Sequence, residues 1–410
     1  MHYGALMTPE PKKVLVLTST LPRWANDTEP RFVEYLGYEL ARHFEVCMLA
    51  PRCPGAARDE VFEQGGQSIR VHRFRYFLAP LESLTYAGGI LARLRQNPLR
   101  LLLVPFFLAA QLVSIRKLHR IHQFDAIHAH WIIPQGLVVA LLATLSSKTP
   151  PVLVTAHGGD LFALRGSLMT RLKRWVLRKA DHVAVVSKAM RSTAVELGCN
   201  ESAVTVQSMG VDLQGTFTPG DATAKRAGLV FVSRLVEKKG VRYLVEAVSR
   251  LVDRFPELEL VIIGDGPLRR ELADLVKRHR LEQNIRFVGS IPNTELPGYL
   301  QKAQIAVMPS VVAASGDQEG LGLVAVEAMG CGCAVVASDL PAVRDTIIDG
   351  ETGLMAQPGN PSDLADKIAV LLDDSALLTR LAKNGRRHAL EHFDWRRVGD
   401  SYAQLIRGML

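Results

Sequence analysis

Residues 305–330 read IAVMPSVVAASGDQEGLGLVAVEAMG and contain the patterns of a strand, a glycine-rich turn and a helix, in that order. The apolar run IAVMPS is typical of a strand buried on both faces, and LVAVEAM has helical composition. Gly320 and Gly322 permit a tight turn, which would leave free N–H groups at the helix start, where an anion can bind. Glu319 and Glu327 stand on either side of that turn. The stretch therefore predicts a strand–turn–helix unit that holds an anion between two carboxylates.

The same unit recurs along the chain in two series. The strands of the first half are KVLVLTS, DAIHAH, PVLVTAH and HVAVVS, and those of the second are GLVFVSR, LELVIIGDG, NIRFVGS, IAVMPS and AVVAS. Continuous apolar strands that alternate with helices indicate parallel sheets covered on both faces. The chain has 410 residues, which is more than one core usually spans. We therefore expect an α/β protein of two doubly wound, Rossmann-like domains that face each other across a cleft.

The polar stretch QGTFTPGDATAKRAG separates the two series and has the composition of a linker. We expect an N-terminal domain over residues 1–214, a linker over 215–228, and a C-terminal domain over 229–385. Residues 386–410 are expected to form a final helix.

Charge and cysteine content narrow the class of protein. Residues 1–218 hold 25 Lys and Arg against 16 acids, whereas residues 219–410 hold 24 against 25. A basic half can serve nucleic acid, an anionic membrane or an anionic substrate. No zinc-finger or RNA-recognition signature accompanies it, so we expect no nucleic-acid partner. The five scattered cysteines favour a reducing compartment, and the start MHYGALMTPEPKKVLVLT lacks the apolar core of a signal peptide. We expect a cytoplasmic protein.

Two cations follow another strand, in FVSRLVEKKGVRYLVEA. Arg234 and Lys239 lie between the end of this strand and the start of a helix. They could be solvated surface charges, but their spacing also suits a clamp on a diphosphate. No Asp-x-Asp triplet occurs in the sequence, so a metal that bridges the diphosphate has no obvious ligands and none is expected.

The motifs EGLGLVAVEA, SRLVEKKG, IIGDGP and RFVGSIP, at this spacing, resemble the donor half of the retaining glycosyltransferases of family 4, which share the two-domain GT-B fold. The resemblance runs from about residue 12 to 410 and is strongest over 228–360. It implies metal-independent transfer of a hexose from a nucleotide-diphosphate sugar, with retained stereochemistry. It also implies that the final helix crosses back to the first domain.

The resemblance assigns a role to each donor-side motif. Arg234 and Lys239 would hold the diphosphate, Glu319 the hydroxyls of the transferred sugar, and Glu327 the ribose. The turn after Glu319 would bind the distal phosphate, and the nucleobase would lie near the end of the strand in RFVGS. The expected donor site is Arg234, Lys239, Val288, Gly289, Glu319, Gly320, Leu321, Gly322, Leu323, Val324 and Glu327.

On the acceptor side, PVLVTAHGGDLFAL is similar to the family element T-x-H-G-x-D, which begins here at Thr155. The resemblance implies that His157 lines the cleft and faces the transferring sugar, with Gly158 and Asp160 beside it. The expected catalytic set is therefore His157, Arg234, Lys239 and Glu319.

The segment IHAHWIIPQG adds His130 as a second cleft residue, while His128 is expected to pack in the core. Its His-x-His spacing lacks a carboxylate or cysteine partner, so we expect no metal there. The first strand–helix loop, TSTLPRWANDTEPRFVEYL, has no glycine, whereas many family members carry a glycine pair in this loop. Similar loops occur in a branch associated with exopolysaccharide assembly. We expect Arg23 and Trp24 to contact the acceptor, which would be a lipid-linked saccharide.

Residues 70–120 carry nine Lys and Arg and one acid, Glu82, around an apolar run at 99–115. The run is shorter than the roughly 20 residues that a transmembrane helix needs. Two interpretations remain open: a buried helix pair under the first sheet, or a helix that lies on an anionic membrane.

Three other activities are conceivable. A nucleotide-sugar epimerase of similar fold would need no acceptor, and a catalytically silent subunit would bind the nucleotide sugar without turning it over. A dehydrogenase is disfavoured, because no G-x-G-x-x-G follows the first strand.

Overall fold

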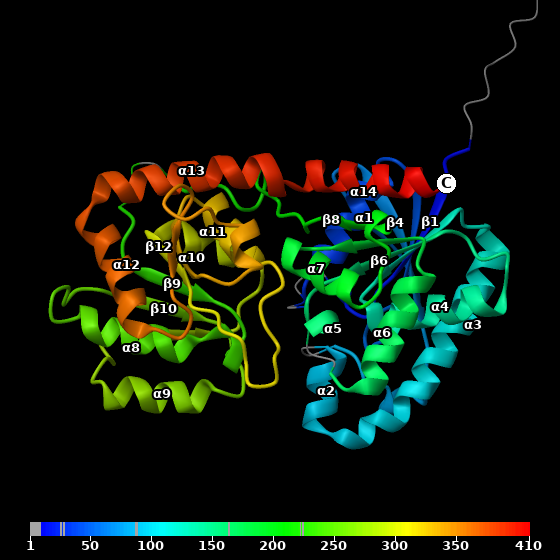
Figure 1. The fold of residues 1–410 in the computed structure, drawn as a ribbon, viewed down its shortest axis with the longest axis horizontal. Coiled ribbons are helices and arrows are strands. Elements are labelled where there is room, and N and C mark those ends of the chain that lie inside the picture. The colour runs from blue at the N-terminus through cyan, green and yellow to red at the C-terminus, as the bar shows by residue number, and fades with distance from the viewer. Residues whose placement is uncertain are drawn as a thin grey trace, which may run out of the picture.

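The computed structural model of the chain describes residues 10–410 apart from residues 25, 26, 28, 87, 88, 163, 164, 222 and 224. Two domains lie side by side, each with a sheet between layers of helices, and helices α13 (Ser375–Phe393) and α14 (Trp395–Met409) run along one side of both (Figure 1). This is the GT-B arrangement expected from the sequence.

The N-terminal domain has an eight-stranded sheet with the order β3-β4-β2-β1-β5-β6-β7-β8, parallel except for the pair β3–β4. The strands are β1 (Lys13–Leu17), β2 (Glu45–Pro51), β3 (Asp59–Gln64), β4 (Gln67–Phe74), β5 (Ala126–His130), β6 (Val152–Ala156), β7 (His182–Val185) and β8 (Val204–Val206). Its helices include α1 (Phe32–Ala41), α2 (Ile90–Gln96), η2 (Pro98–Leu103), α3 (Val104–His122), α4 (Leu137–Leu145), α5 (Gly159–Phe162), α6 (Ser167–Lys179) and α7 (Lys188–Glu196).

The C-terminal domain has a fully parallel six-stranded sheet with the order β11-β10-β9-β12-β13-β14. The strands are β9 (Leu229–Val232), β10 (Leu260–Ile263), β11 (Ile285–Gly289), β12 (Ile305–Met308), β13 (Ala334–Ser338) and β14 (Leu354–Ala356). Its helices include η5 (Glu237–Lys239), α8 (Val241–Leu251), α9 (Arg269–Arg278), α10 (Leu296–Lys302), α11 (Leu323–Gly330) and α12 (Pro361–Asp373).

In both sheets the strand order reverses direction at one point. The chain leaves β1 on one side and returns through β5 on the other, and β9 and β12 flank the same kind of point in the second sheet. Ligands of doubly wound sheets bind at the carboxyl ends of the strands at such a switch point. The loops after β5, β9 and β12 are therefore where a site should be sought.

Two chain crossings join the domains. The first is the segment between β8 and β9, and the second lies between α13 and α14. They touch, because Val211 N–H donates to the carbonyl of Phe393 (2.8 Å) and Trp395 N–H donates to the carbonyl of Val211 (3.2 Å). Beyond this point α14 packs against α1 and buries Tyr402 completely in the N-terminal domain. Residues 386–393 belong to the end of α13, so the helix that returns to the first domain is α14 itself.

The segment α2–η2–α3 projects from the N-terminal domain at the end away from α13 and α14 (Figure 1). One stripe of α3, formed by Phe107, Gln111, Ile115 and Leu118, is buried in the domain core. The preceding helix η2 and the first turn of α3 are exposed: Leu99 is 73% accessible, Leu101 62%, Leu102 71% and Phe106 52%. This exposure argues against a buried helix pair under the sheet.

Candidate active site

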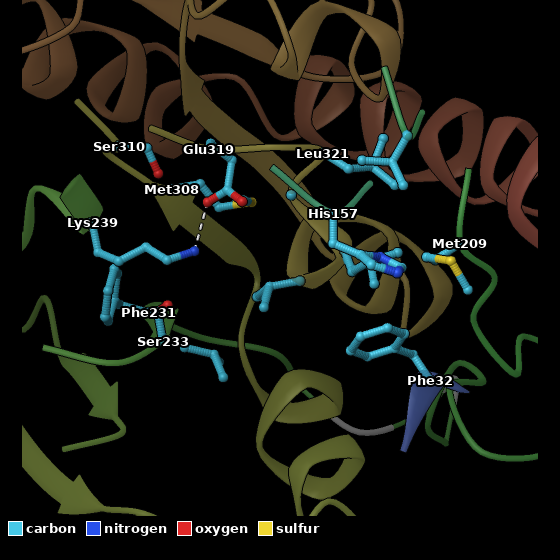
Figure 2. Close-up of a pocket in the computed structure, with 15 residues that line it drawn as sticks. Phe32, His157, Met209, Phe231, Ser233, Lys239, Met308, Ser310, Glu319 and Leu321 are labelled. Carbon is cyan, nitrogen blue, oxygen red and sulfur yellow. Dashed lines mark hydrogen bonds and ion pairs between the residues drawn. The ribbon is translucent and has the colours of Figure 1, made fainter. Parts of the chain in front are cut away.

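A pocket of about 230 Å³ opens between the domains, at the carboxyl ends of β9 and β12. The N-terminal domain contributes Phe32 and His157, and the C-terminal domain contributes Lys239 and Glu319, which face them (Figure 2). The full lining is Phe32, His157, Val186, Met209, Phe231, Val232, Ser233, Lys239, Met308, Ser310, Glu319, Leu321, Gly322, Leu323 and Val324. Of the expected catalytic set, His157, Lys239 and Glu319 meet here.

Lys239 and Glu319 form an ion pair across the pocket, with 2.5 Å between Nζ and Oε2 (Figure 2). Burial raises the pKa of Glu319, but Lys239 and then Lys238 lower it by more, so the carboxylate is charged well below neutral pH. The pocket thus holds one half-buried cation and one half-buried anion that satisfy each other, and either can exchange its partner for a ligand group of the right charge.

The short helix η5 fixes the loop that carries Glu319. Lys238 forms an ion pair with Asp317 (3.0 Å), and a carboxylate oxygen of Glu237 accepts the N–H of Ala314 (2.8 Å). At the far end of the loop the buried hydroxyl of Thr346 donates to the carbonyl of Leu321 (2.8 Å). Glu237 and Lys238 are bonded to the loop, and Lys239 is the η5 cation that lines the pocket.

The start of α11 forms one wall of the pocket. Gly322 precedes this helix with φ +87°, a backbone conformation that favours glycine, and turns the chain from the loop into the helix. Leu323 and Val324, the first helical residues, line the pocket. Their N–H groups lie in the first turn, where a helix leaves its donors free and carries partial positive charge. Lys239 and this helix terminus together suit a phosphate.

His157 follows β6 and is held by aromatic rings. Phe32, Trp131 and His130 lie with their ring centroids 5.1, 5.0 and 5.2 Å from that of His157. Its Nε2 is 2.9 Å from Nδ1 of His130, which is fully buried behind it and does not line the pocket. Burial lowers the pKa of His157 to about 3, so the ring is neutral at physiological pH.

Asp160 fixes the backbone around His157. Its two carboxylate oxygens accept hydrogen bonds from the N–H of His157 (3.0 Å) and the N–H of Ile132 (2.7 Å). The Asp160 side chain therefore connects the loop after β6 to the loop after β5. Burial nevertheless raises the pKa of Asp160. The side chain is committed to these bonds and does not line the pocket.

The domains meet backbone to backbone beside the pocket. A Cβ built on Gly320 would lie 2.9 Å from the carbonyl oxygen of His157, and a Cβ built on Gly158, whose φ is +101°, would lie 3.0 Å from Cα of Gly320. This approach closes one side of the pocket and sets how near His157 comes to the C-terminal domain.

Other expected donor residues lie at the rim or outside the pocket lining. Arg234 follows β9 and is exposed, and Val288 and Gly289 end β11, two strands from the switch point. Arg23 and Trp24 are also outside it: the guanidinium of Arg23 stacks on Trp24 at 4.3 Å and binds both carboxylate oxygens of Asp27. Arg23, Trp24 and Asp27 therefore contact one another, while residues 25, 26 and 28 between and beside them lie outside the described set.

Glu327, in the second turn of α11, is half-buried and does not line the pocket. Burial raises its pKa from 4.5 to about 8. Between about pH 4.5 and pH 8 the folded protein therefore holds a proton here that the unfolded chain has already released.

We expect this proton to make the free energy of unfolding depend on pH. Because the folded pKa is the higher one, the contribution of Glu327 is complete below about pH 4.5 and is lost as the pH rises through about 8. In urea titrations the stability of the wild type relative to Glu327→Gln should fall over this range, by at most about 1.4 kcal/mol per pH unit, and then level off. Parallel pH profiles of the two proteins would contradict the raised pKa.

Sequence reasoning missed much of the lining. The missed residues are Phe32, Val186, Met209, Phe231, Val232, Ser233, Met308 and Ser310. Ser233 directly follows β9 and Ser310 is the second residue after β12, so the rule that ligands bind at strand ends could have found them. The apolar members give no such signal, because their sequence context is that of ordinary core residues.

The pocket combines a lysine, a helix N-terminus, a carboxylate, two serine hydroxyls and a neutral histidine. Such a set can hold a phosphate group at one end and hydroxyl groups at the other. Within the described ranges, no group of three or more His, Cys, Asp and Glu side chains is arranged to hold a metal ion.

Comparison with known proteins agrees with this arrangement. Residues 220–388 match the family model of glycosyl transferases group 1, and residues 30–214 match that of glycosyltransferase family 4. Glycogen synthase of Mycobacterium tuberculosis is 31% identical over 293 residues, which cover 68% of each chain. Phosphatidyl-myo-inositol mannosyltransferase of the same organism is 28% identical and aligns with 85% of this chain and 84% of its own.

Among solved structures, the Anabaena protein HepE in complex with UDP-glucose superposes with a TM-score of 0.70 over 97% of this chain and 99% of its own. At 17% sequence identity this likeness establishes the fold alone. The two family models, the similarity to the mycobacterial glycogen synthase and the fold lead to one conclusion: the chain belongs to the GT-B glycosyltransferases of the group 1 and family 4 type, and it is a glycosyltransferase enzyme.

Proposed function

We propose that this enzyme transfers a hexose from a nucleotide-diphosphate sugar to an acceptor hydroxyl, with retained stereochemistry at the donor carbon. The observation that carries the proposal is the pair Lys239–Glu319 in a pocket that also contains the N-terminus of α11 and His157. HepE, which shares the fold, has been solved with UDP-glucose, and this supports a nucleotide sugar as the donor. Membership of a transferase family disfavours the epimerase and the silent binding subunit.

Donor binding requires the ion pair to open. The pocket of about 230 Å³ is smaller than the roughly 300–1,000 Å³ of most ligand sites. A diphosphate offers Lys239 a new anion, and sugar hydroxyls offer Glu319 new donors. Each half-buried charge would therefore exchange one partner for another, so that neither is left unpaired. The ribose would then extend toward Glu327 and the base toward Val288 and Gly289.

The chemistry we infer is departure of the nucleoside diphosphate assisted by positive charge. Lys239, Arg234 and the N–H groups of Leu323 and Val324 would stabilise the charge that develops on the leaving diphosphate, without a metal ion. His157 would face the transferring sugar from the other domain. The acceptor hydroxyl would attack from the same face that the leaving group vacates, as the bond between the donor carbon and the diphosphate oxygen breaks, and its proton would pass to the departing diphosphate.

The donor is tested by a thermal-shift and turnover screen with UDP-, GDP- and ADP-hexoses. A donor at 100 times its Kd should stabilise the fold by about 2.7 kcal/mol, and the same donor should release its nucleoside diphosphate slowly in water and faster with acceptor. If no sugar nucleotide stabilised the protein or was consumed, the proposal would fail. Conversion of the sugar with no release of nucleoside diphosphate would indicate an epimerase.

We further infer that the acceptor is a lipid-linked saccharide of exopolysaccharide or cell-surface glycan synthesis, and that the enzyme lies on the cytoplasmic face of the membrane. The exposed turn of η2 and α3 supports this. We name as the apolar tip the exposed residues Leu78, Leu81, Leu99, Leu101, Leu102 and Phe106. Phe77 and Phe106 pack edge to face at 5.0 Å, which joins its two segments into one surface. The mycobacterial phosphatidyl-myo-inositol mannosyltransferase, by its name, acts on a phosphatidylinositol, which is a lipid.

The tip suits peripheral contact better than a membrane span. Pro98–His122 has 25 residues and contains an 18-residue window with a mean hydropathy of 1.8, which by length and composition would suffice to cross a membrane. However, Phe107, Gln111, Ile115 and Leu118 are packed into the sheet domain, and spanning would remove them from it. Arg93 and Arg100 donate hydrogen bonds to Ser83, whereas Arg95, at the end of α2 just before the tip in sequence, is exposed.

We expect the protein to co-sediment with vesicles that contain anionic lipid, since burying one Leu or Phe side chain contributes about 1.5–3 kcal/mol and each nearby cation about 1 kcal/mol. The triple variant Leu99→Ser/Leu101→Ser/Leu102→Ser should lose most of this binding and keep its turnover with a soluble acceptor. The matched control, Val61→Ser/Val370→Ser, removes exposed apolar side chains elsewhere and should bind as the wild type does. Equal binding by both variants would exclude the apolar tip as the contact.

A further inference from the structure

The buried contact behind His157 has no role in the reaction described above. Nδ1 of His130 lies 2.9 Å from Nε2 of His157, and the two rings are nearly coplanar, with 15° between their planes. His130 is fully buried, and its other ring nitrogen, Nε2, has no hydrogen-bond partner among the described residues. His157 lines the pocket, so its Nδ1 is the ring nitrogen that this contact leaves for a ligand.

Both rings are neutral at physiological pH. Burial lowers the pKa of His157 to about 3, and burial together with the neighbouring histidines lowers the pKa of His130 well below its ordinary value. A neutral imidazole carries one proton, on either Nδ1 or Nε2, and the other nitrogen accepts. Two neutral rings joined by one short contact must share a single proton along it, so the tautomer of one fixes the tautomer of the other.

Two arrangements satisfy the contact. If His157 donated from Nε2, His130 would accept at Nδ1 and carry its own proton on Nε2, where that N–H would be buried without an acceptor. If His130 donates from Nδ1, its unpaired Nε2 is only an unused acceptor. An orphaned buried N–H is rarer in folded proteins than an under-satisfied acceptor. The second arrangement is therefore the stable one.

We propose that His130 is a positioning residue that holds His157 in the tautomer protonated at Nδ1, so that His157 presents a hydrogen-bond donor to the ligand in the pocket. Its ligand group is then an oxygen with a free lone pair, such as a sugar hydroxyl oxygen. The opposite wall offers the carboxylate of Glu319, which can only accept. The consequence for turnover rests on the proposed function, but the tautomer itself does not.

The tautomer is tested directly by two-bond ¹⁵N–¹H correlation spectra of protein labelled in histidine, recorded without ligand. The chain has 12 histidines, and the His157→Ala variant identifies the signals of His157. We expect the Nδ1–H pattern for His157 in the wild type. It should persist in His130→Asn, whose amide keeps a donor near the position of Nδ1, and should be lost in His130→Leu. A wild-type His157 that carries its proton on Nε2 would overturn the proposal, whatever the protein's activity.

Turnover supplies the second readout. With a donor identified by the screen, His130→Leu should lower kcat by about tenfold or more while the donor KM stays within about threefold, and His130→Asn should restore most of the loss. The control is His128→Leu: His128 is equally buried on β5 but bonds to Thr155 (2.8 Å) and makes no hydrogen bond to His157. An equal loss in His128→Leu, or none in His130→Leu, would assign His130 to packing alone. If the spectra agree but no donor is turned over, the proposed function fails and the tautomer stands.

Discussion

Lys239→Ala should lower kcat by about 10²–10³, the scale of losing one preorganised group at developing charge. The reason is geometric: Lys239 is the lysine that lines the pocket, and it already lies 2.5 Å from Glu319. Steady-state kinetics with the donor from the screen would measure it. Arg234→Ala should also slow turnover, and rates within about threefold of the wild type for both variants would remove the diphosphate clamp.

Lys238→Ala is the matched control for this experiment. Lys238 is the preceding residue of η5, is buried to a similar extent and also pairs with a carboxylate, but it does not line the pocket. Its loss should loosen the loop and cost far less activity. Because Lys239→Ala leaves the half-buried Glu319 without its ion-pair partner, the single variant should also lose stability, by less than the about 3–5 kcal/mol of a fully buried pair. Lys239→Ala/Glu319→Gln should recover stability without recovering turnover, which separates the two effects.

Gly320→Ala should lower kcat by about 10²-fold, because a displacement of about 1 Å at a catalytic site can cost that much. The new Cβ would stand 2.9 Å from the carbonyl oxygen of His157, and neither is a flexible side chain, so the domains must separate there. His157 would move away from Glu319 and Lys239. Since each domain keeps its own core, we expect the unfolding transition to shift little.

Gly159→Ala provides the comparison. Gly159 follows Gly158 and begins α5, but a Cβ there would meet nothing within 4 Å. Its variant should retain wild-type kinetics. If Gly320→Ala were equally active, the close approach of the two loops would have no part in turnover. A crystal structure of Gly320→Ala would show whether the domains had moved apart.

Most of the strands that the sequence predicted are buried on both faces, although the predicted strand β11 is partly exposed at the edge of its sheet. All nine predicted runs are strands of the two parallel sheets. β2, β3 and β4 were not predicted. β3 is exposed at the sheet edge and antiparallel to its partner, so it lacks a continuous apolar run. β2 is buried after its first residue, so its run EVCMLAP was a signal that the prediction missed. β8 and β14 have three residues each, too few to show a pattern.

The site was predictable where local chemistry marks it. Lys239, Glu319 and the turn at Gly322 follow strands and precede helices, and they do meet. Their direct ion pair could not be read from the sequence, because the residues are 80 positions apart and the contact depends on how η5 supports the loop. His130 was expected in the cleft but lies behind His157. The alternation of side chains along β5 shows which face of the sheet His130 is on, but not that the ring of His157 lies between it and the pocket. The exposure of Leu99–Leu102 was also not evident, because the same apolar run suits a core helix.

The placement of α14 has a consequence for how the chain matures during translation. Domains generally fold as units as they leave the ribosome, the N-terminal one first. Here the N-terminal domain lacks part of its core until residues 395–409 have been made, because Val398, Tyr402 and Ile406 of α14 fill the surface next to α1. The C-terminal domain, although later in sequence, is complete by the end of α13. The first domain to be synthesised is therefore the last to complete its core. Until α14 has been synthesised, the surface of α1 that it covers stays exposed to solvent and can bind chaperones or other nascent chains.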